Sequence, residues 1–196
     1  MAIADAHNVS RTRCGTRHGL AFRWRARVLA ALLLLALFIP QSRDAETATG
    51  AELPSVALSG LSGESPTSTD AMRGAPLIIN FWATWCGPCR EEMQSLELLS
   101  HRLSGSGVRV IGIATDRDLN LAAEFVRERR LTFPMYADGP ARQLQSMLRV
   151  RSLPETLLVS ADGVILARIL GARDWNGIKS DRLVLNTLGL QLVVAE

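Results

Sequence analysis

Residues 77–90 read LIINFWATWCGPCR, and this stretch decides the fold. Its first part, Leu77–Phe81, is apolar over its whole length except for one asparagine, as expected of a buried strand. A helix is predicted directly afterwards, from about Cys86 to Ser104, because apolar residues recur there at helical spacing. Cys86 and Cys89 therefore lie where a strand passes into the first turn of a helix.

The start of a helix suits a reactive cysteine. Its first turn has unpaired backbone N–H groups and the positive end of the helix dipole, and both stabilise a thiolate and lower its pKa. The spacing places Cys89 one turn below Cys86, and Pro88 fits a turn in which no N–H is needed. We predict that Cys86, as the exposed nucleophile, attacks a substrate disulfide and that Cys89, as the buried thiol, resolves the mixed disulfide.

Other chemistry fits these residues less well. A zinc site needs two further Cys or His ligands, and His101 is the only one after residue 40. A purely structural disulfide would be unusual at a helix start. A peroxide-reducing P-x-x-x-T-x-x-C pattern would need proline and threonine where Ile79 and Ala83 stand. We therefore expect no metal and no cofactor apart from a redox-active Cys86–Cys89 disulfide.

The formal net charge of +3 over 196 residues hides an asymmetry. Residues 1–27 hold six arginines and one aspartate, which gives +5, whereas the rest of the chain holds 16 basic and 18 acidic residues, which gives −2. A nucleic-acid-binding domain carries its positive charge on the folded part. Because the positive charge lies in the N-terminal segment here, we expect no nucleic acid partner.

A twelve-residue apolar run, VLAALLLLALFI, follows at residues 28–39 and ends at Pro40. Basic residues before a short apolar run are typical of an export signal or a signal anchor. Both alternatives stay open, because the run is short for a bilayer span and the best small residues for cleavage, Ala48 and Gly50, lie far from it. Either way, the residues that follow are expected on the outer side of the membrane.

The chain is thus expected to have four parts. These are a basic N-terminal region at residues 1–27, a signal anchor or signal-peptide apolar region at 28–40, a polar linker at 41–51 and one folded domain at 52–196. A retained anchor would hold the domain at a bacterial inner membrane, facing the periplasm. A cleaved signal would leave it soluble in the periplasm.

Strands and helices alternate in the folded domain. Strands are expected at 53–58, 77–81, 108–114, 133–136, 156–159 and 164–170, and helices at 86–104, up to Arg130 from a cap at Asp118 or Asn120, at 141–148 and at 174–188. Residues 59–70 indicate a loop or weak hairpin, and Asp162-Gly163 between apolar runs predicts a hairpin turn. The order predicts an α/β fold in which helices flank a central mixed β-sheet.

The segment Phe81–Arg90, FWATWCGPCR, closely resembles the active site of membrane-anchored, thioredoxin-like thiol–disulfide oxidoreductases of the TlpA, ResA and DsbE type. The resemblance extends from Glu52 to the C-terminal helix. It implies a thioredoxin-like fold with an N-terminal strand extension and a central insertion, to which Asp116–Ala137 corresponds. The C-G-P-C motif is similar to thioredoxin and TlpA, while Pro154-Glu155-Thr156 is similar to DsbE, so the subfamily stays open.

The resemblance also implies roles for residues away from the cysteines. Thioredoxin-like proteins have a cis-proline loop that faces the C-x-x-C, which implies a cis bond at Pro154 and a Leu153 backbone free to pair with an extended substrate. Asn80 stands where thioredoxin has a buried aspartate that accepts a proton, and an amide cannot do so. Glu155 is therefore a candidate proton relay, the alternative being a solvated side chain.

The remaining aromatic and turn residues are expected to shape the site or fill the core. Trp85 is expected to cover the disulfide, and Gly87, Pro88 and Pro154 to shape its surroundings. Three further aromatic side chains are assigned to the core: Phe81 and Trp82 beside the sheet, and Trp175 in the last helix.

By resemblance, the function is that of a periplasmic dithiol reductant. It would take electrons from a membrane thiol–electron transporter and reduce protein disulfides, one expected substrate being apocytochrome c before haem attachment. A disulfide-forming oxidase and a non-catalytic, anchored binding module are the alternatives. We expect a monomer held at the inner membrane through residues 28–40.

Overall fold

The computed structural model describes residues 49–190, which belong to one compact unit. The predicted basic region at 1–27 and apolar region at 28–40 lie outside the described residues, as does most of the predicted linker. Among residues 49–190, no helix combines the length and the apolar character needed to cross a membrane.

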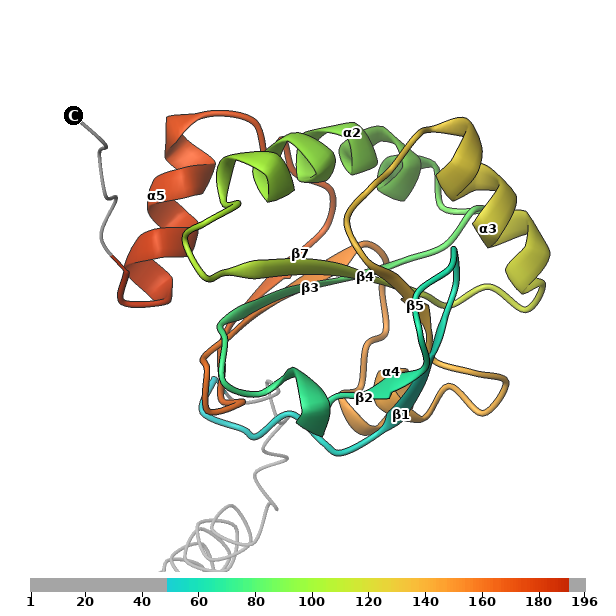
Figure 1. Cartoon of the computed structure of the whole chain (residues 1–196), viewed down its shortest axis with the longest axis horizontal. Helices are drawn as coiled ribbons and strands as arrows, with labels where there is room; N and C mark the ends of the chain where they lie inside the picture. The colour runs from blue at the N-terminus through green and yellow to red at the C-terminus, as the bar shows by residue number, and fades with distance from the viewer. Residues whose placement is uncertain (1–48, 191–196) are drawn as a thin grey trace, which may run out of the picture. The chain divides into compact units, whose positions relative to one another are not determined.

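A seven-stranded mixed sheet forms the centre of the unit (Figure 1), with strand order β2-β1-β5-β4-β3-β6-β7. The strands are β1 (Ala57–Gly60), β2 (Thr67–Ser68), β3 (Leu77–Trp82), β4 (Arg109–Ala114), β5 (Met135–Ala137), β6 (Glu155–Val159) and β7 (Ile165–Leu170). β3 pairs in parallel with β4, and β4 with β5, while the other neighbouring pairs are antiparallel.

Helices cover both faces of this sheet (Figure 1), which confirms the predicted α/β fold. The helices are η1 (Asp70–Met72), α2 (Gly87–Arg102), α3 (Leu119–Glu128), α4 (Gln143–Met147) and α5 (Ile178–Thr187). α2, α3 and α5 lie on one side, and α4 and η1 lie on the other. A central strand covered on both faces reads as a continuous apolar run, which explains the composition of β3.

The side chains of β3 alternate between two core clusters. Ile78 and Trp82 pack with α2, α3 and α5, while Leu77, Ile79 and Phe81 pack on the opposite face. The complete burial of Phe81 and Trp82 confirms their predicted place in the core.

Most predicted elements are present, with shifted ends. Asp118 is the cap of α3, accepting a hydrogen bond from the Asn120 N–H at 3.0 Å. β6 and β7 form the predicted hairpin, with Gly163 at a φ of 86° in its turn. Residues 59–70 form the loop and second strand of a weak hairpin, in which Ala57 and Leu58 of β1 pair with Ser68 and Thr67 of β2.

Two predicted boundaries are wrong by several residues. The first strand begins at Ala57 rather than Leu53, because the segment before it makes only an isolated antiparallel bridge, between Glu52 and Val164, and the Leu53 N–H donates to the Gly163 carbonyl of the β6–β7 turn. The last helix begins at Ile178 rather than Asp174, because Gly177 precedes it with a φ of 104° that is incompatible with a right-handed helix.

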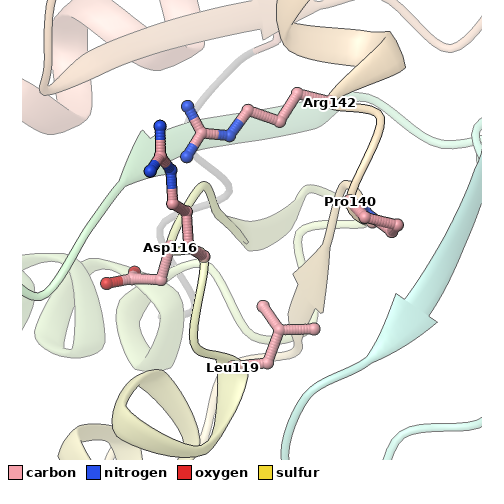
Figure 2. Close-up of a pocket in the computed structure, with 6 residues that line it drawn as sticks. Asp116, Leu119, Pro140 and Arg142 are labelled. Atoms are coloured by element: carbon pink, nitrogen blue, oxygen red, sulfur yellow. The ribbon is translucent and has the colours of Figure 1, made fainter.

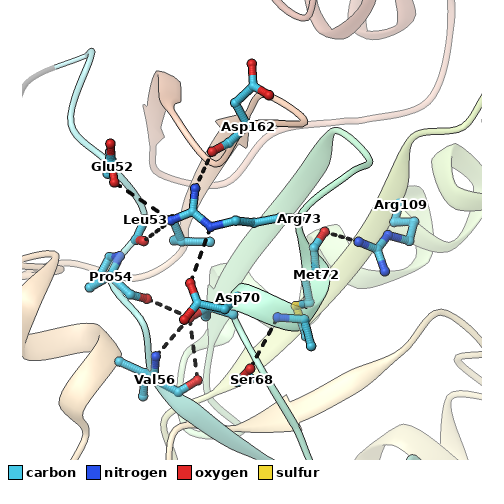
Figure 3. A network of polar contacts seen from close by, with 12 residues as sticks. Glu52, Leu53, Pro54, Val56, Ser68, Asp70, Met72, Arg73, Arg109 and Asp162 are labelled. Carbon is cyan, nitrogen blue, oxygen red and sulfur yellow. Dashed lines mark hydrogen bonds and ion pairs between the residues drawn. The ribbon is translucent and has the colours of Figure 1, made fainter.

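Arg73 fastens the segment before β1 to the sheet (Figure 3). Its guanidinium donates to the Asp162 carbonyl in the β6–β7 turn and, at 3.4 Å, to the Leu53 carbonyl. Its Nε also donates to Asp70 at 3.3 Å. These contacts join three separate parts of the chain at the edge of the sheet where β6 ends.

The last residues of the predicted linker lie against the same edge. The Gly50 N–H donates to the Ile165 carbonyl at 2.7 Å, and the Ile165 N–H donates to the Ala51 carbonyl at 2.8 Å. The described part of the chain therefore joins the sheet beside the start of β7.

Glu97 is a buried carboxylate on α2 that holds the segment leading into β5. It accepts hydrogen bonds from the Thr132 N–H at 2.8 Å, from the Thr132 hydroxyl, from the Phe133 N–H at 3.4 Å and from His101 at 2.9 Å. Burial by itself would raise the pKa of Glu97, but the hydrogen bonds outweigh burial and lower this pKa.

We expect Glu97→Gln to destabilise the fold at neutral pH by about 1–3 kcal/mol, because it disrupts charge-assisted hydrogen bonds to buried donors. A carboxyl with a lowered folded-state pKa stabilises the fold above its unfolded pKa, and this contribution is lost as the pH falls through the folded pKa. The deficit of the variant should therefore shrink in acid. Urea denaturation from acid to neutral pH measures it, with Glu91→Gln on the exposed face of α2 as control. A deficit that does not vary with pH would contradict this account.

Candidate active site

Four strand ends meet at one edge of the sheet. β3, β4 and β5 are parallel, so their carboxyl ends, at Trp82, Ala114 and Ala137, lie together. β6 runs in the opposite direction and begins at this edge with Glu155, directly after Pro154. The carboxyl edge of parallel strands is where α/β sheets bind ligands, and the loop after β3 leads there to Cys86 and, in the first turn of α2, to Cys89.

Cys86 and Cys89 are joined by a disulfide, with their Cα atoms 5.2 Å apart. Cys86 is the N-cap of α2, and its Sγ accepts a hydrogen bond from the Cys89 N–H at 3.2 Å. Gly87 and Pro88 follow as the first two residues of the helix, so the proline occupies the first turn as predicted. The N–H groups and the dipole of α2 are thus directed at Cys86.

The two cysteines differ less in exposure than predicted. Cys86 is 6% exposed and Cys89 is fully buried, so the expectation of an exposed Cys86 is wrong for the disulfide-bonded form. Both cysteines belong to the core cluster between α2 and the sheet, which explains their burial. Because all of the exposed surface of the pair belongs to Cys86, a substrate sulfur can reach only this cysteine.

Two large apolar side chains are exposed at the edge of the sheet that carries Cys86 and Cys89. Trp85, directly before Cys86, is 69% exposed. Leu170, which pairs with Glu155 at the end of β7, is also largely exposed. That Trp85 covers the disulfide stays a prediction.

The peptide bond between Leu153 and Pro154 is cis, as the resemblance implied. Glu155 follows as the first residue of β6, is buried and pairs with Arg168 of β7. The alternative of a solvated Glu155 is therefore wrong. Burial raises the pKa of Glu155, and the Arg168 charge opposes this rise. A proton relay through Glu155 stays a prediction.

Glu92, a residue that the sequence reasoning did not single out, is a second buried carboxyl near the disulfide. Its Oε1 accepts a hydrogen bond from Asn80 Nδ2 at 2.8 Å, and its Oε2 accepts from the Arg173 N–H at 3.0 Å and from Trp175 Nε1 at 3.3 Å. Burial raises the pKa of Glu92, against the effect of these hydrogen bonds. No cation pairs with it among the described residues.

This carboxyl sits one helical turn beyond Cys89, on the same side of α2. Side chains three residues apart on a helix are neighbours, so Glu92 is placed to exchange a proton with the Cys89 thiol. Asn80 cannot exchange a proton, but it fixes the Glu92 carboxyl and also donates to Thr156 Oγ1 at 2.9 Å. The acid missing from position 80 thus has a counterpart on the facing helix.

The helical pattern itself could have revealed Glu92. Cys89, Glu92, Met93 and Leu96 follow each other at helical spacing, so an acid among them belongs to the buried face.

The prediction that Trp175 belongs to the last helix is wrong. Trp175 precedes α5 and hydrogen-bonds to Glu92 of α2. Gly177 ends the irregular segment that holds it there.

We expect Glu92→Gln to slow the attack of Cys89 on a mixed disulfide by about 10²-fold at neutral pH, because the thiol loses its proton acceptor. The rate at which the Cys86 thiol is alkylated should be nearly the same in this variant as in the wild type. A chromophoric thiol bound to Cys86 reports the attack as it is released. Glu91→Gln, an exposed substitution next in the chain, is the control. Equal release rates in the wild type and Glu92→Gln would refute the role of Glu92.

The same variant has a second, independent signature in stability. A carboxyl whose folded-state pKa is raised contributes stability that is fully present below its unfolded-state pKa and is lost as the pH rises through the raised folded-state pKa. Glu92→Gln should therefore gain stability relative to the wild type as the pH rises. Urea denaturation over that range measures the gain.

The described residues contain no group of three or more His, Cys, Asp or Glu side chains that could hold a metal ion. The chemistry on display at this edge is that of a dithiol–disulfide pair at a helix N-terminus with buried carboxyls nearby.

Comparison with solved structures confirms the thioredoxin-like fold. A thiol:disulfide interchange protein of the thioredoxin family from Chlorobium tepidum TLS superposes with a TM-score of 0.60 and 25% identity, covering 72% of this chain and 99% of that one. A secreted Mycobacterium tuberculosis disulfide oxidoreductase homologous to E. coli DsbE has a TM-score of 0.54 and 23% identity, covering 68% and 95%.

Curated relatives agree with the site. The chain is similar to the thiol-disulfide oxidoreductase ResA of Bacillus cereus, with 30% identity over 122 residues that cover 62% of this chain and 69% of that protein. It is similar to the thiol:disulfide interchange protein HelX of Rhodobacter capsulatus, with 32% identity over 123 residues that cover 62% and 68%.

Fold, disulfide and relatives together define a thiol–disulfide oxidoreductase of the thioredoxin superfamily, as the motif predicted. The Redoxin family profile matches residues 48–184, and the chain belongs to the Redoxin family.

Proposed function

We propose that this protein is a dithiol reductant of exported proteins, attached to a bacterial inner membrane. The observation that carries the proposal is the Cys86–Cys89 pair at the start of α2, with Cys89 buried and Glu92 one turn further along the helix. The names of the relatives, a thiol-disulfide oxidoreductase and a thiol:disulfide interchange protein, support the same class of reaction.

The reaction proceeds in two exchanges. In the reduced protein, the Cys86 thiolate attacks a sulfur of the substrate disulfide, whose S–S bond breaks as the other substrate sulfur leaves as a thiolate. Cys89 then gives up its proton and attacks Cys86 Sγ, which releases the second substrate thiolate. The protein is left with the Cys86–Cys89 disulfide, and the substrate has gained two electrons and, from solvent or Glu92, two protons.

The N-terminal sequence supports the proposed compartment. The +5 charge of residues 1–27 before the apolar run favours retention of that end in the cytoplasm and exposure of the domain in the periplasm. The periplasm is oxidising, so a reductant that works there must be supplied with electrons. We assign that supply to a membrane thiol–electron transporter, which reduces the Cys86–Cys89 disulfide by the reverse exchanges. No bound cofactor is needed.

Apocytochrome c is the substrate that we propose first. Haem attaches to the two cysteines of a C-x-x-C-H motif, and an intramolecular disulfide between them blocks attachment. Such a disulfide spans few residues and lies in an unfolded chain. The extended segment beside the disulfide can therefore pair with the sheet edge next to Pro154.

The reduction potential distinguishes a reductant from an oxidase. We expect a value close to the about −270 mV of thioredoxin, because a reductant must hold its electrons at low potential. Equilibration with glutathione or dithiothreitol redox buffers, followed by alkylation of free thiols, gives the value. A potential near about −120 mV, that of a strong oxidant, would contradict the proposal and favour disulfide formation.

Trapping identifies the substrates. Cys89→Ser blocks the second exchange, so mixed disulfides between Cys86 and substrates should accumulate in the periplasm and disappear on treatment with dithiothreitol. The double variant Cys86→Ser/Cys89→Ser is the matched control and should trap nothing. If Cys86→Ser cells make normal amounts of c-type cytochrome, the domain acts as a binding module rather than as a reductant.

A further inference from the structure

A pocket of roughly 440 Å³ opens beside the loop that leads to the disulfide (Figure 2). Its lining comes from the loops after β4 and β5: Asp116, Arg117, Leu119, Gly139, Pro140 and Arg142. The proposed reaction uses none of these six residues.

The sheet topology explains why this pocket adjoins the active site. β3, β4 and β5 are parallel neighbours, so the loop with the cysteines and the two loops that line the pocket leave the same edge. Asp116 connects them directly, because its carboxylate accepts hydrogen bonds from the Thr84 N–H at 3.1 Å and from the Thr84 hydroxyl at 2.5 Å. Thr84 lies two residues before Cys86.

The acidic side chains of these loops already have partners. Asp116 is bound by Thr84, as described above. Asp118 caps α3. Asp138 accepts hydrogen bonds from the Leu144 N–H at 2.8 Å and from the Gln145 N–H at 2.7 Å. Each carboxylate is therefore satisfied mainly by backbone donors of its own surroundings.

The two arginines of the lining are in the opposite situation. Neither Arg117 nor Arg142 forms an ion pair or a side-chain hydrogen bond with any residue in the described range. In Figure 2 the Arg142 side chain extends from the start of α4 toward the side of the pocket where Asp116 lies. The pocket thus presents two guanidinium groups outside any ion pair of the described residues, although the Arg142 charge also acts on the nearby Asp138 carboxyl. Their N–H groups match the two oxygens of a carboxylate.

The backbone of Arg142 has an uncommon conformation. It has a φ of 46° and a ψ of 48°, in the left-handed region, which is uncommon for a residue other than glycine and is found often at functional sites. The hydrogen bonds of Asp138 to the first turn of α4 fix the loop on both sides of this residue. These contacts fix the point from which the Arg142 side chain extends, while its guanidinium stays without a hydrogen-bonding partner among the described residues.

We propose that the Arg117–Arg142 pocket binds an acidic side chain of the protein substrate and thereby selects disulfides that have a Glu or Asp nearby. The inference rests on the proposed reductant function and adds a determinant of substrate choice to it. Three properties of the pocket support this proposal. Its lining contains two arginines and one aspartate, it lies beside the loop that leads to Cys86, and its volume of roughly 440 Å³ is large enough for a side chain.

The test uses the full-length reduced protein in detergent and synthetic peptides with one internal disulfide. In one set of peptides a single Glu is moved stepwise away from the reacting cysteine, and in a matched set Gln replaces it. At the best position, the Glu peptide should be reduced about two- to fivefold faster than its Gln counterpart, as expected for solvent-accessible ion pairs. Added salt should reduce this ratio.

Arg117→Gln and Arg142→Gln should each lower the ratio, and the double variant should bring it near one while Cys86 alkylation stays unchanged. Arg127→Gln removes the same charge from an exposed position on α3 outside the pocket lining, and it should preserve the ratio. Because Arg142 occupies an unusual backbone conformation, Arg117→Gln provides the decisive result if Arg142→Gln does not fold.

Several outcomes would overturn the inference. Equal rates for Glu and Gln peptides in the wild type would remove the preference but leave the reductant function intact. An equal effect of Arg127→Gln would indicate general attraction instead of a pocket. Binding of inorganic phosphate by the wild type without any Glu preference would assign the pocket to free anions. Failure to reduce either peptide would overturn the proposed function, and this inference with it.

Discussion

The burial of β3 on both faces is the constraint on which the rest of the structure depends. A strand without a solvent-facing side must be central, so β4 and β6 pair with its two edges and helices cover both of its faces. The end of β3 then fixes where α2 begins, and with it the position of Cys86. The reactive pair is held by the most deeply buried strand of the domain, although the chemistry takes place at the sheet edge.

α2 carries two buried carboxyls whose pKa values shift in opposite directions. Glu97 is surrounded by donors from the segment before β5, which favour its ionised form, whereas burial dominates at Glu92 and favours its protonated form. The same residue type on one helix therefore has two different tasks. One carboxylate is a structural anchor, and the other is suited to exchange a proton beside Cys89.

The sequence predicted the parts of this protein that depend on local pattern. β3, α2, the β6–β7 turn and the C-x-x-C at a helix start follow from apolar runs and turn residues within short windows. The site residues contributed by distant segments could not be found in this way: Glu92 becomes significant only once Asn80, Arg173 and Trp175 converge on it. Glu155 was ambiguous for the same reason, since its partner Arg168 lies on the next strand. Leu53 shows that an apolar residue can be buried without belonging to a strand.

The described part of the chain enters the sheet beside Ile165, where the backbones of Gly50 and Ala51 hydrogen-bond to the start of β7. β7 runs from this point to Leu170 at the disulfide edge, so that the two lie roughly 17 Å apart along one strand. The point where the described chain enters the sheet and the edge that carries the disulfide therefore lie at opposite ends of one strand.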